Sequence, residues 1–301
     1  MVGRLRHNED NRLRHEQDHD TDGLDRGNMI RAKMSALMVA AVLAIGVQSP
    51  ALGRDLCTIV ADASTRAILH QEGNCETRVT PASTFKIALA VMGFADGILT
   101  SSEAPKLPFK QGYADWGGAA WKEDATPARW MKHSIVWYSQ RLAEAMGAER
   151  LGLHARNFGY GNADFSGDPG KNNGLERAWI SSSLAISPLE QAAFLAALVE
   201  RGLPVSAEAM AGAMALVEEA GTVDGWRIFG KTGSAYPRNR DESFDRARGW
   251  GWFVGWAEKG GQTLVFARLA QDEERHPVSG GLRARDALVR DWAGLIRAAG
   301  L

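Results

Sequence analysis

Ser83 and Lys86 are the residues whose types and spacing point most directly to chemistry, in the tetrad Ser83-Thr84-Phe85-Lys86. A helix is predicted to open here, and residues three positions apart share one face of a helix. The free amides at its start favour developing negative charge on the serine. Burial among apolar neighbours disfavours the charged ammonium, so the lysine can act as general base for the serine nucleophile. The tetrad alone is a weak signal, because a helix cap beside a snorkelling lysine has the same spacing.

Two triplets later in the chain strengthen this interpretation. Ser134 begins a Ser-x-Val triplet, and Lys231 begins a Lys-Thr-Gly triplet at the end of a predicted strand. Each triplet is common by itself. Ser-x-x-Lys, Ser-x-Val and Lys-Thr-Gly in this order resemble the pattern of penicillin-recognising acyl transferases. The order therefore predicts four catalytic residues, Ser83, Lys86, Ser134 and Lys231.

The residue types of the two triplets fit the steps of such a reaction. Ser134 and Lys231 can relay a proton to the leaving nitrogen of a β-lactam. Lys231 and Thr232 suit the carboxylate of the substrate, and Gly233 lets the strand backbone approach the ligand closely. The amides of the nucleophile and of Ser234 are expected to form an oxyanion hole.

Several further segments carry the motifs of one family. They are Pro81-Ala82-Ser83-Thr84-Phe85-Lys86, Ser134-Ile135-Val136-Trp137, Tyr160-Gly161-Asn162, Trp179 with Ser181-Ser182-Ser183-Leu184, Lys231-Thr232-Gly233, and Gly251-Trp252-Phe253-Val254-Gly255-Trp256. On these motifs, which extend over residues 57–292, the chain resembles the class D, oxacillinase-type serine β-lactamases. The resemblance implies an α/β (α+β) fold of the serine β-lactamase/transpeptidase type. Its central antiparallel sheet is flanked by helices, with an all-helical lobe and the active site in the seam.

The resemblance also implies that Lys86 is a modified residue. In class D enzymes this lysine reacts with carbon dioxide to form a carbamate, which serves as the general base. Carbon dioxide or bicarbonate is then needed, and no other cofactor is expected. The resemblance places Val136, Trp179 and Ile180 around the carbamate, with the indole N–H of Trp179 as a hydrogen-bond donor. Because only a neutral amine attacks carbon dioxide, this pocket must be dry.

An arginine for the carboxylate of the substrate is harder to assign. Members of the family often place one on or just before the C-terminal helix, which makes Arg283 the first candidate and Arg285 the second. A solvated cation that pairs with Asp286 is an open alternative for either side chain. The resemblance alone does not choose among these.

Other kinds of hydrolase lack support in the sequence. The four histidines after residue 53 have no metal-ligand spacing, so no metal is predicted. No Gly-x-Ser-x-Gly elbow of an α/β-hydrolase appears. The Glu-x-x-x-N and Ser-Asp-Asn patterns of class A β-lactamases are missing as well.

Hydrophobic periodicity predicts the elements that must position these residues. Strands early and late in the chain, with helices between them, suggest one sheet built from both chain ends. A Ser-Pro-x-Glu capping box marks the start of one helix. We expect strands over 58–62, 66–71, 226–230, 250–258 and 263–270, and helices over 81–94, 130–146, from 187 onward and over 281–299.

The N-terminus has the features of an export signal. Arg31 and Lys33 precede an apolar run over 36–47, and small residues follow as far as Gly53. Residues 29–53 are therefore predicted to be a signal peptide, and the run is too short for stable membrane insertion. We interpret residues 1–28 as a non-native or unstructured extension, with Met29 as the true initiator; a structured extension is the alternative. The catalytic domain is expected over 54–301, in a periplasmic or secreted protein.

Two cysteines, Cys57 and Cys75, are the only ones in the chain. Export would place them in an oxidising compartment, where a pair tends to form a disulfide. They flank the first predicted hairpin, which a bridge would close. Two free thiols are the alternative.

Composition limits the partners. The formal net charge is −1 and 45% of the residues are hydrophobic, which gives no reason to expect nucleic acid or a membrane surface. We expect small β-lactam molecules as substrates and leave the oligomeric state open. Two rival functions share the motifs: a D,D-peptidase that binds penicillin, and a β-lactam sensor domain. A sensor would need further membrane spans, and no apolar run after residue 53 approaches that length.

Overall fold

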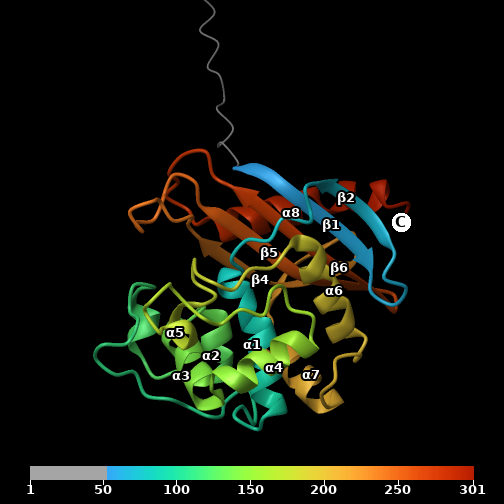
Figure 1. The fold of residues 1–301 in the computed structure, drawn as a ribbon. Coiled ribbons are helices and arrows are strands. Elements are labelled where there is room, and N and C mark those ends of the chain that lie inside the picture. Colours follow the sequence, from blue (N-terminus) through green and yellow to red (C-terminus); the bar gives the residue numbers. More distant parts are fainter. Residues whose placement is uncertain (1–52) are drawn as a thin grey trace, which may run out of the picture. The chain divides into compact units, whose positions relative to one another are not determined.

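Six antiparallel strands form one sheet in the order β2-β1-β6-β5-β4-β3 (Figure 1). The computed structural model describes residues 53–301, so the predicted extension and nearly all of the predicted leader lie outside the described residues. The strands are β1 (Arg54–Asp62), β2 (Ile68–Gly73), β3 (Glu219–Val223), β4 (Trp226–Ala235), β5 (Trp250–Lys259) and β6 (Gln262–Gln271).

The sheet joins the two ends of the described chain. β1 lies between β2 and β6, and it pairs antiparallel with both. This arrangement confirms the sheet that was expected from the early and late strands. The edge strand β3 was not predicted, because its five residues include a glycine and are too few to show an alternating pattern.

One face of the sheet is covered by the C-terminal helix α8 (Gly280–Ala298). Phe253 and Phe266 point to this face, where they pack against Trp292 of the helix. Their neighbours Trp252 and Val254 belong to the core on the opposite side. This alternation follows from the period of two in a strand, and it explains why β5 is apolar from Trp250 to Ala257.

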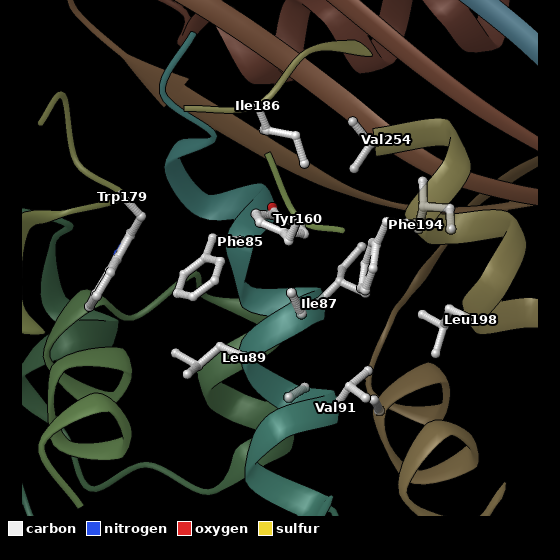
Figure 2. Packing of buried hydrophobic residues seen from close by; sticks show 14 of the residues in the cluster. Phe85, Ile87, Leu89, Val91, Tyr160, Trp179, Ile186, Phe194, Leu198 and Val254 are labelled. Carbon is white, nitrogen blue, oxygen red and sulfur yellow. The ribbon is translucent and has the colours of Figure 1, made fainter. Parts of the chain in front are cut away.

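The opposite face carries the helical part of the chain, with α1 at its centre (Figures 1 and 2). Nine of the eleven residues of α1 are buried, and all of these except Lys86 are uncharged and without a polar side chain, as expected for a helix inside the core. The elements are the 3-10 turn η1 (Ala82–Thr84), α1 (Phe85–Ala95), the 3-10 turn η2 (Ala119–Lys122), α2 (Pro127–Lys132), α3 (Val136–Met146), α4 (Ala148–Asn157), α5 (Gly174–Arg177), α6 (Pro188–Val199) and α7 (Ala207–Ala215).

The capping box predicted for α6 is confirmed. The Ser187 hydroxyl accepts from the amide of Glu190 at 3.2 Å, and the Glu190 carboxylate accepts from the amide of Ser187 at 2.9 Å. Such a cap contributes about 1 kcal/mol to a helix. It also fixes the point at which the chain enters the helix that packs on β6 and β1.

The helix predicted over 130–146 is wrong in one respect, because it is two helices. α2 ends at Lys132 and α3 begins at Val136. Between them Ser134 has a φ of 57°, in the left-handed region that an L-residue rarely adopts, and Ile135 is extended. The break redirects the chain, and its apolar flanks hide it from an analysis of periodicity.

Two further observations concern the N-terminal part of the chain. Cys57 in β1 and Cys75 just after β2 are joined by a disulfide, which closes the first hairpin. Within residues 53–301, no helix has both the length and the apolar character needed to cross a membrane.

Candidate active site

The nucleophile candidate Ser83 lies on η1, one turn ahead of α1, rather than within the helix itself. The turn is held by Pro81, whose carbonyl accepts from the Thr84 amide at 3.2 Å and from the Thr84 hydroxyl at 2.8 Å. Ala82 has a φ of 51°. A non-glycine residue in this region stores about 1–3 kcal/mol of strain and is typical of functional sites.

Lys86 lies beside this serine, as the spacing predicts. Its Nζ donates to Ser83 Oγ at 3.2 Å. The lysine side chain is 1% exposed, and burial lowers its pKa well below the ordinary value, with the nearby charge of Lys231 acting in the same direction. Burial therefore favours the neutral amine, which is the form that can accept the serine proton.

A second serine and lysine face the first pair. Nζ of Lys231, in β4, donates to Ser134 Oγ at 3.1 Å and to the Thr232 carbonyl at 3.3 Å. Burial lowers the pKa of Lys231 to about 8, although the charge of Glu218 raises it in part. At pH 7 this lysine is mostly protonated, so it supplies a positive charge and a proton donor next to Ser134.

The Lys-Thr-Gly triplet does not end its strand, because β4 continues to Ala235. Gly233 also has a packing role. A Cβ at this position would lie 2.8 Å from the Pro81 carbonyl oxygen and 3.0 Å from Thr84 Cγ2. The missing side chain thus makes room for the turn that carries the nucleophile, which contacts the strand directly.

Ser83, Ser134, Lys231 and Gly233 line one cavity of about 520 Å³, whereas Lys86 is buried beside Ser83 and does not line it. Most of the predicted site residues line it, and so do several that the sequence did not single out. Those lie in loops and at helix ends, where no periodic pattern marks a side chain that faces a ligand. The cavity is lined by Ala82, Ser83, Trp116, Gly117, Trp121, Lys132, His133, Ser134, Val136, Ile180, Lys231, Thr232, Gly233, Ser234, Ser279 and Leu282.

Trp179 is the most informative of the residues that were expected around Lys86. Its side chain is 1% exposed, and its ring lies 5.4 Å from that of Phe85, between centroids (Figure 2). The indole N–H has no hydrogen-bond partner in the described part of the chain. An unpaired buried donor costs about 1–3 kcal/mol, so it calls for an acceptor that the protein itself does not supply.

Arg283 lies in the first turn of α8, but it does not line this cavity, so the structure does not bring it together with the other predicted site residues. Its guanidinium forms an ion pair with Asp272, and its Nε donates to the Val278 carbonyl at 3.1 Å. Both side chains are largely buried, and Arg283 lines a separate small cavity beside Arg268. Arg285 pairs with Asp286, and it lines a small neighbouring cavity together with Lys231 and Thr232. The active-site cavity is lined instead by three residues with hydroxyl side chains, Thr232, Ser234 and Ser279.

The described residues contain no group of three or more His, Cys, Asp or Glu side chains arranged for a metal ion. The geometry instead joins one serine to a buried lysine whose pKa is lowered, and a second serine to a second lysine. It defines the class of serine acyl-transferring enzymes with a penicillin-binding transpeptidase-type fold.

Comparisons with known proteins identify the family. Residues 56–293 match the family described as penicillin binding protein transpeptidase domain. The chain is 42% identical to β-lactamase OXA-9 of Klebsiella pneumoniae over 233 residues, which are 77% of this chain and 85% of that protein. It is 37% identical to β-lactamase OXA-1 of Escherichia coli over 217 residues, or 71% and 75% of the two chains.

A solved structure agrees with these relatives. The class D β-lactamase OXA-427 is 44% identical, with a TM-score of 0.74, over 81% of this chain and 99% of that one. The protein therefore belongs to the class D β-lactamases. The resemblance and the fold inferred from the motifs are confirmed.

Proposed function

We propose that this protein hydrolyses β-lactam antibiotics through an acyl-enzyme on Ser83. One observation carries the proposal: the Lys86 amine, whose pKa is lowered by burial, lies 3.2 Å from the serine hydroxyl. A single base in this position can take the proton of the serine and later that of a water molecule. Both halves of a hydrolysis can then occur at one site.

Acylation begins when Ser83 Oγ attacks the lactam carbonyl and gives its proton to the base at Lys86. The amides of Ser83 and Ser234 stabilise the oxyanion. The C–N bond then breaks, and the nitrogen takes a proton from Ser134, which Lys231 replenishes at 3.1 Å. Lys231 and the hydroxyl of Thr232, which both line the cavity, hold the carboxylate of the substrate. Water then cleaves the ester and frees the serine.

We further propose that Lys86 is carbamylated by carbon dioxide. The residues present fit the group: a neutral amine, the apolar Val136 and Ile180 on the cavity wall, and the unpaired N–H of Trp179. A carbamate would supply an oxygen base that reaches both the serine and the hydrolytic water. Lys86 must stay unprotonated to accept the group, and burial provides this condition.

A D,D-peptidase or a sensor domain would also be acylated at Ser83 but would keep the acyl group. The buried base and the unpaired indole N–H favour turnover, because release requires a base that activates water. The test is a time course with a chromogenic cephalosporin, together with mass spectrometry of the protein. We expect many turnovers and a transient acyl adduct. A permanent adduct in ample bicarbonate would overturn the proposal.

Two variants make the test specific. Ser83→Ala should form no adduct and show no turnover. Ser64→Ala, which changes an exposed turn serine bonded to Asp62, should match the wild type and serves as the control. Turnover by Ser83→Ala would show that another residue is the nucleophile.

We also propose that the protein is exported, with residues 29–53 removed. The support is the basic start, apolar run and small residues of that segment, which lies almost wholly outside the described residues. N-terminal sequencing of protein from the periplasm or the medium tests this. A mature chain that begins near residue 54 is expected, and one that begins at Met1 would overturn the proposal.

A further inference from the structure

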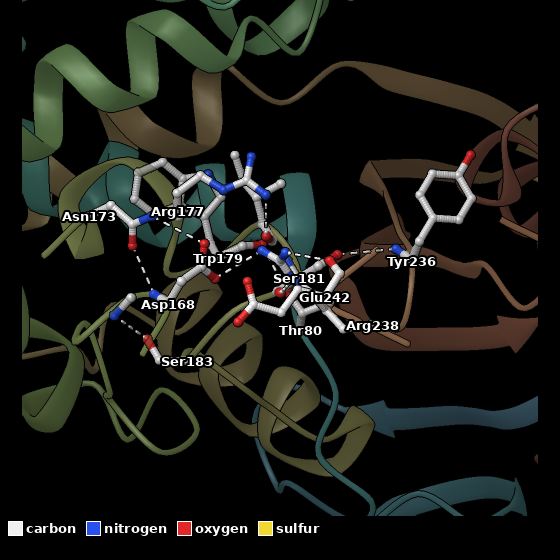
Figure 3. Close-up of polar contacts among 12 residues, drawn as sticks. Thr80, Asp168, Asn173, Arg177, Trp179, Ser181, Ser183, Tyr236, Arg238 and Glu242 are labelled. Atoms are coloured by element: carbon white, nitrogen blue, oxygen red, sulfur yellow. Dashed lines mark hydrogen bonds and ion pairs between the residues drawn. The ribbon is translucent and has the colours of Figure 1, made fainter. Parts of the chain in front are cut away.

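Two segments far apart in the sequence meet next to Ile180, which lines the active-site cavity. The first is the 158–187 segment, between α4 and α6, which carries Trp179 and Ile180. The second is the β4–β5 loop over 236–249, which follows the Lys-Thr-Gly triplet. Figure 3 shows that one side chain, Arg238, reaches from the loop across to the segment.

The Arg238 guanidinium makes three contacts at once. Its Nε donates to the Ser181 carbonyl at 3.1 Å, and its Nη2 pairs with Asp168 Oδ1 at 2.9 Å. Its Nη1 donates to the Glu242 carbonyl, within its own loop, at 3.0 Å. The cation also lies 4.7 Å from the ring centroid of Phe244, in the same loop. A planar guanidinium can satisfy these directions together, whereas an ammonium cannot.

Ser181 is fixed from both sides, and it directly follows Ile180. On one side its amide donates to Thr80 Oγ1 at 3.1 Å, while the Thr80 hydroxyl donates to the Trp179 carbonyl at 2.9 Å. On the other side its hydroxyl accepts from the Tyr236 amide at 3.2 Å. The φ of Ser181 is 55°, a strained value that persists only when the surroundings hold it.

The ion pair between Arg238 and Asp168 also links the β4–β5 loop to the first half of the 158–187 segment. Asp168 and Asn173 bond each other, since the Asp168 amide donates to the Asn173 side chain at 2.8 Å and Asn173 Nδ2 donates to the Asp168 carboxylate at 3.1 Å. The Arg238 and Asp168 side chains are 29% and 20% exposed. Partial burial limits screening by solvent, so the pair is stronger than a pair on the open surface.

We propose that Arg238 is a positioning residue for the pocket around Lys86. By tying Ser181 and Asp168 to the β4–β5 loop, it fixes the backbone on either side of Ile180. The indole of Trp179 and the apolar wall then keep their places. Arg238 touches no reacting atom and acts only through this backbone. The inference rests on the proposed carbamylation of Lys86, which needs a dry pocket and an aligned N–H.

The test measures occupancy of Lys86 rather than activity alone. The variants are Arg238→Ala and Arg238→Lys, with Arg246→Ala as the matched control, because Arg246 lies in the same loop over the Tyr236 ring at 5.4 Å. Each protein is titrated with isotopically labelled bicarbonate, and the carbamate is followed by carbon NMR. The half-saturating concentration should rise about tenfold in Arg238→Ala, the usual size of coupling within a bonded network.

The other two variants test whether the geometry of the Arg238 guanidinium matters, and not only its charge. Arg238→Lys should resemble Arg238→Ala. Arg246→Ala should stay within about twofold of the wild type, because Arg246 contacts the ring of Tyr236 and not the backbone amide that bonds Ser181. Saturating bicarbonate should restore most of the kcat of Arg238→Ala, whereas general damage to the fold would not be rescued. An unchanged half-saturating concentration in Arg238→Ala overturns the inference.

Asp168→Asn and the double variant provide a second route that does not depend on Arg238→Ala folding. If the pair acts as a unit, the double variant should be no worse than the poorer single variant. Additive effects would show that Asp168 does not act together with Arg238 in positioning the pocket. A wild-type protein that takes up no label would overturn the proposed carbamylation itself. Uptake by the wild type and an equal uptake by Arg238→Ala would overturn only the positioning role.

Discussion

Replacing Trp179 with phenylalanine removes one buried N–H donor and keeps an aromatic ring in its place. The wild-type indole N–H has no partner in the described part of the chain, although the side chain is 1% exposed. If its partner is a carbamate on Lys86, the substitution weakens uptake of carbon dioxide. If the N–H has no such role, uptake stays the same.

The size of the effect follows from the type of bond. A hydrogen bond to a charged acceptor contributes about 1.5–3 kcal/mol, and about 1.4 kcal/mol corresponds to a factor of ten. The bicarbonate concentration for half-maximal activity should therefore rise roughly 10- to 150-fold in Trp179→Phe. In the absence of carbon dioxide, the same change removes an unpaired donor, so it loses no hydrogen bond.

Trp130→Phe is the matched control. Trp130 is as buried as Trp179, but its Nε1 donates to Ser139 Oγ at 2.8 Å. This control should lower the free energy of unfolding more than Trp179→Phe does in carbon dioxide-free buffer, and it should leave the bicarbonate dependence unchanged. Urea unfolding and steady-state kinetics over a bicarbonate series measure both quantities. An unaltered bicarbonate dependence in Trp179→Phe would refute the role of the indole.

Three further predictions follow from the geometry of the site. Lys86→Ala should block hydrolysis of any acyl-enzyme that forms, because Lys86 is proposed as the base for both acylation and deacylation. Mass spectrometry measures the lifetime of the acyl adduct, and fast loss of the acyl group in this variant would count against the shared base. Gly233→Ala should slow acylation at least about tenfold, because its Cβ would lie 2.8 Å from the Pro81 carbonyl and displace the nucleophile turn; pre-steady-state kinetics at wild-type rates would contradict this. Burial lowers the pKa of Lys231 to about 8 and Glu218 raises it, so Glu218→Gln should lower it further. Above that pKa the unfolded chain binds more protons, so stability should rise with pH from about 8 toward 10.5, and the rise should begin at lower pH in Glu218→Gln. Urea unfolding in carbon dioxide-free buffer checks the shift, and coincident curves for the two proteins would disprove it.

Much of the site could be predicted because its parts obey local rules. Ser83 and Lys86 are three positions apart, so any helical turn brings them together. The capping box at Ser187 and the apolar run of β5 are likewise set by neighbouring residues. The one-sheet arrangement followed because strands at both chain ends need partners, and the pairing of β1 with β6 supplies them.

The sequence by itself determined the chemical groups and their order: a serine with a lysine one turn away, a second serine, and a lysine in a strand. Only the tertiary structure decided how these groups face one another. The contact between Ser134 and Lys231 joins residues 97 positions apart, and it depends on the left-handed turn that breaks the helix. Arg283 illustrates the same limit. Its charge suits the carboxylate of a substrate, but in the structure it forms an ion pair with the carboxylate of Asp272. Local periodicity carries no information about such partners, because long-range packing chooses which of several compatible charges meet.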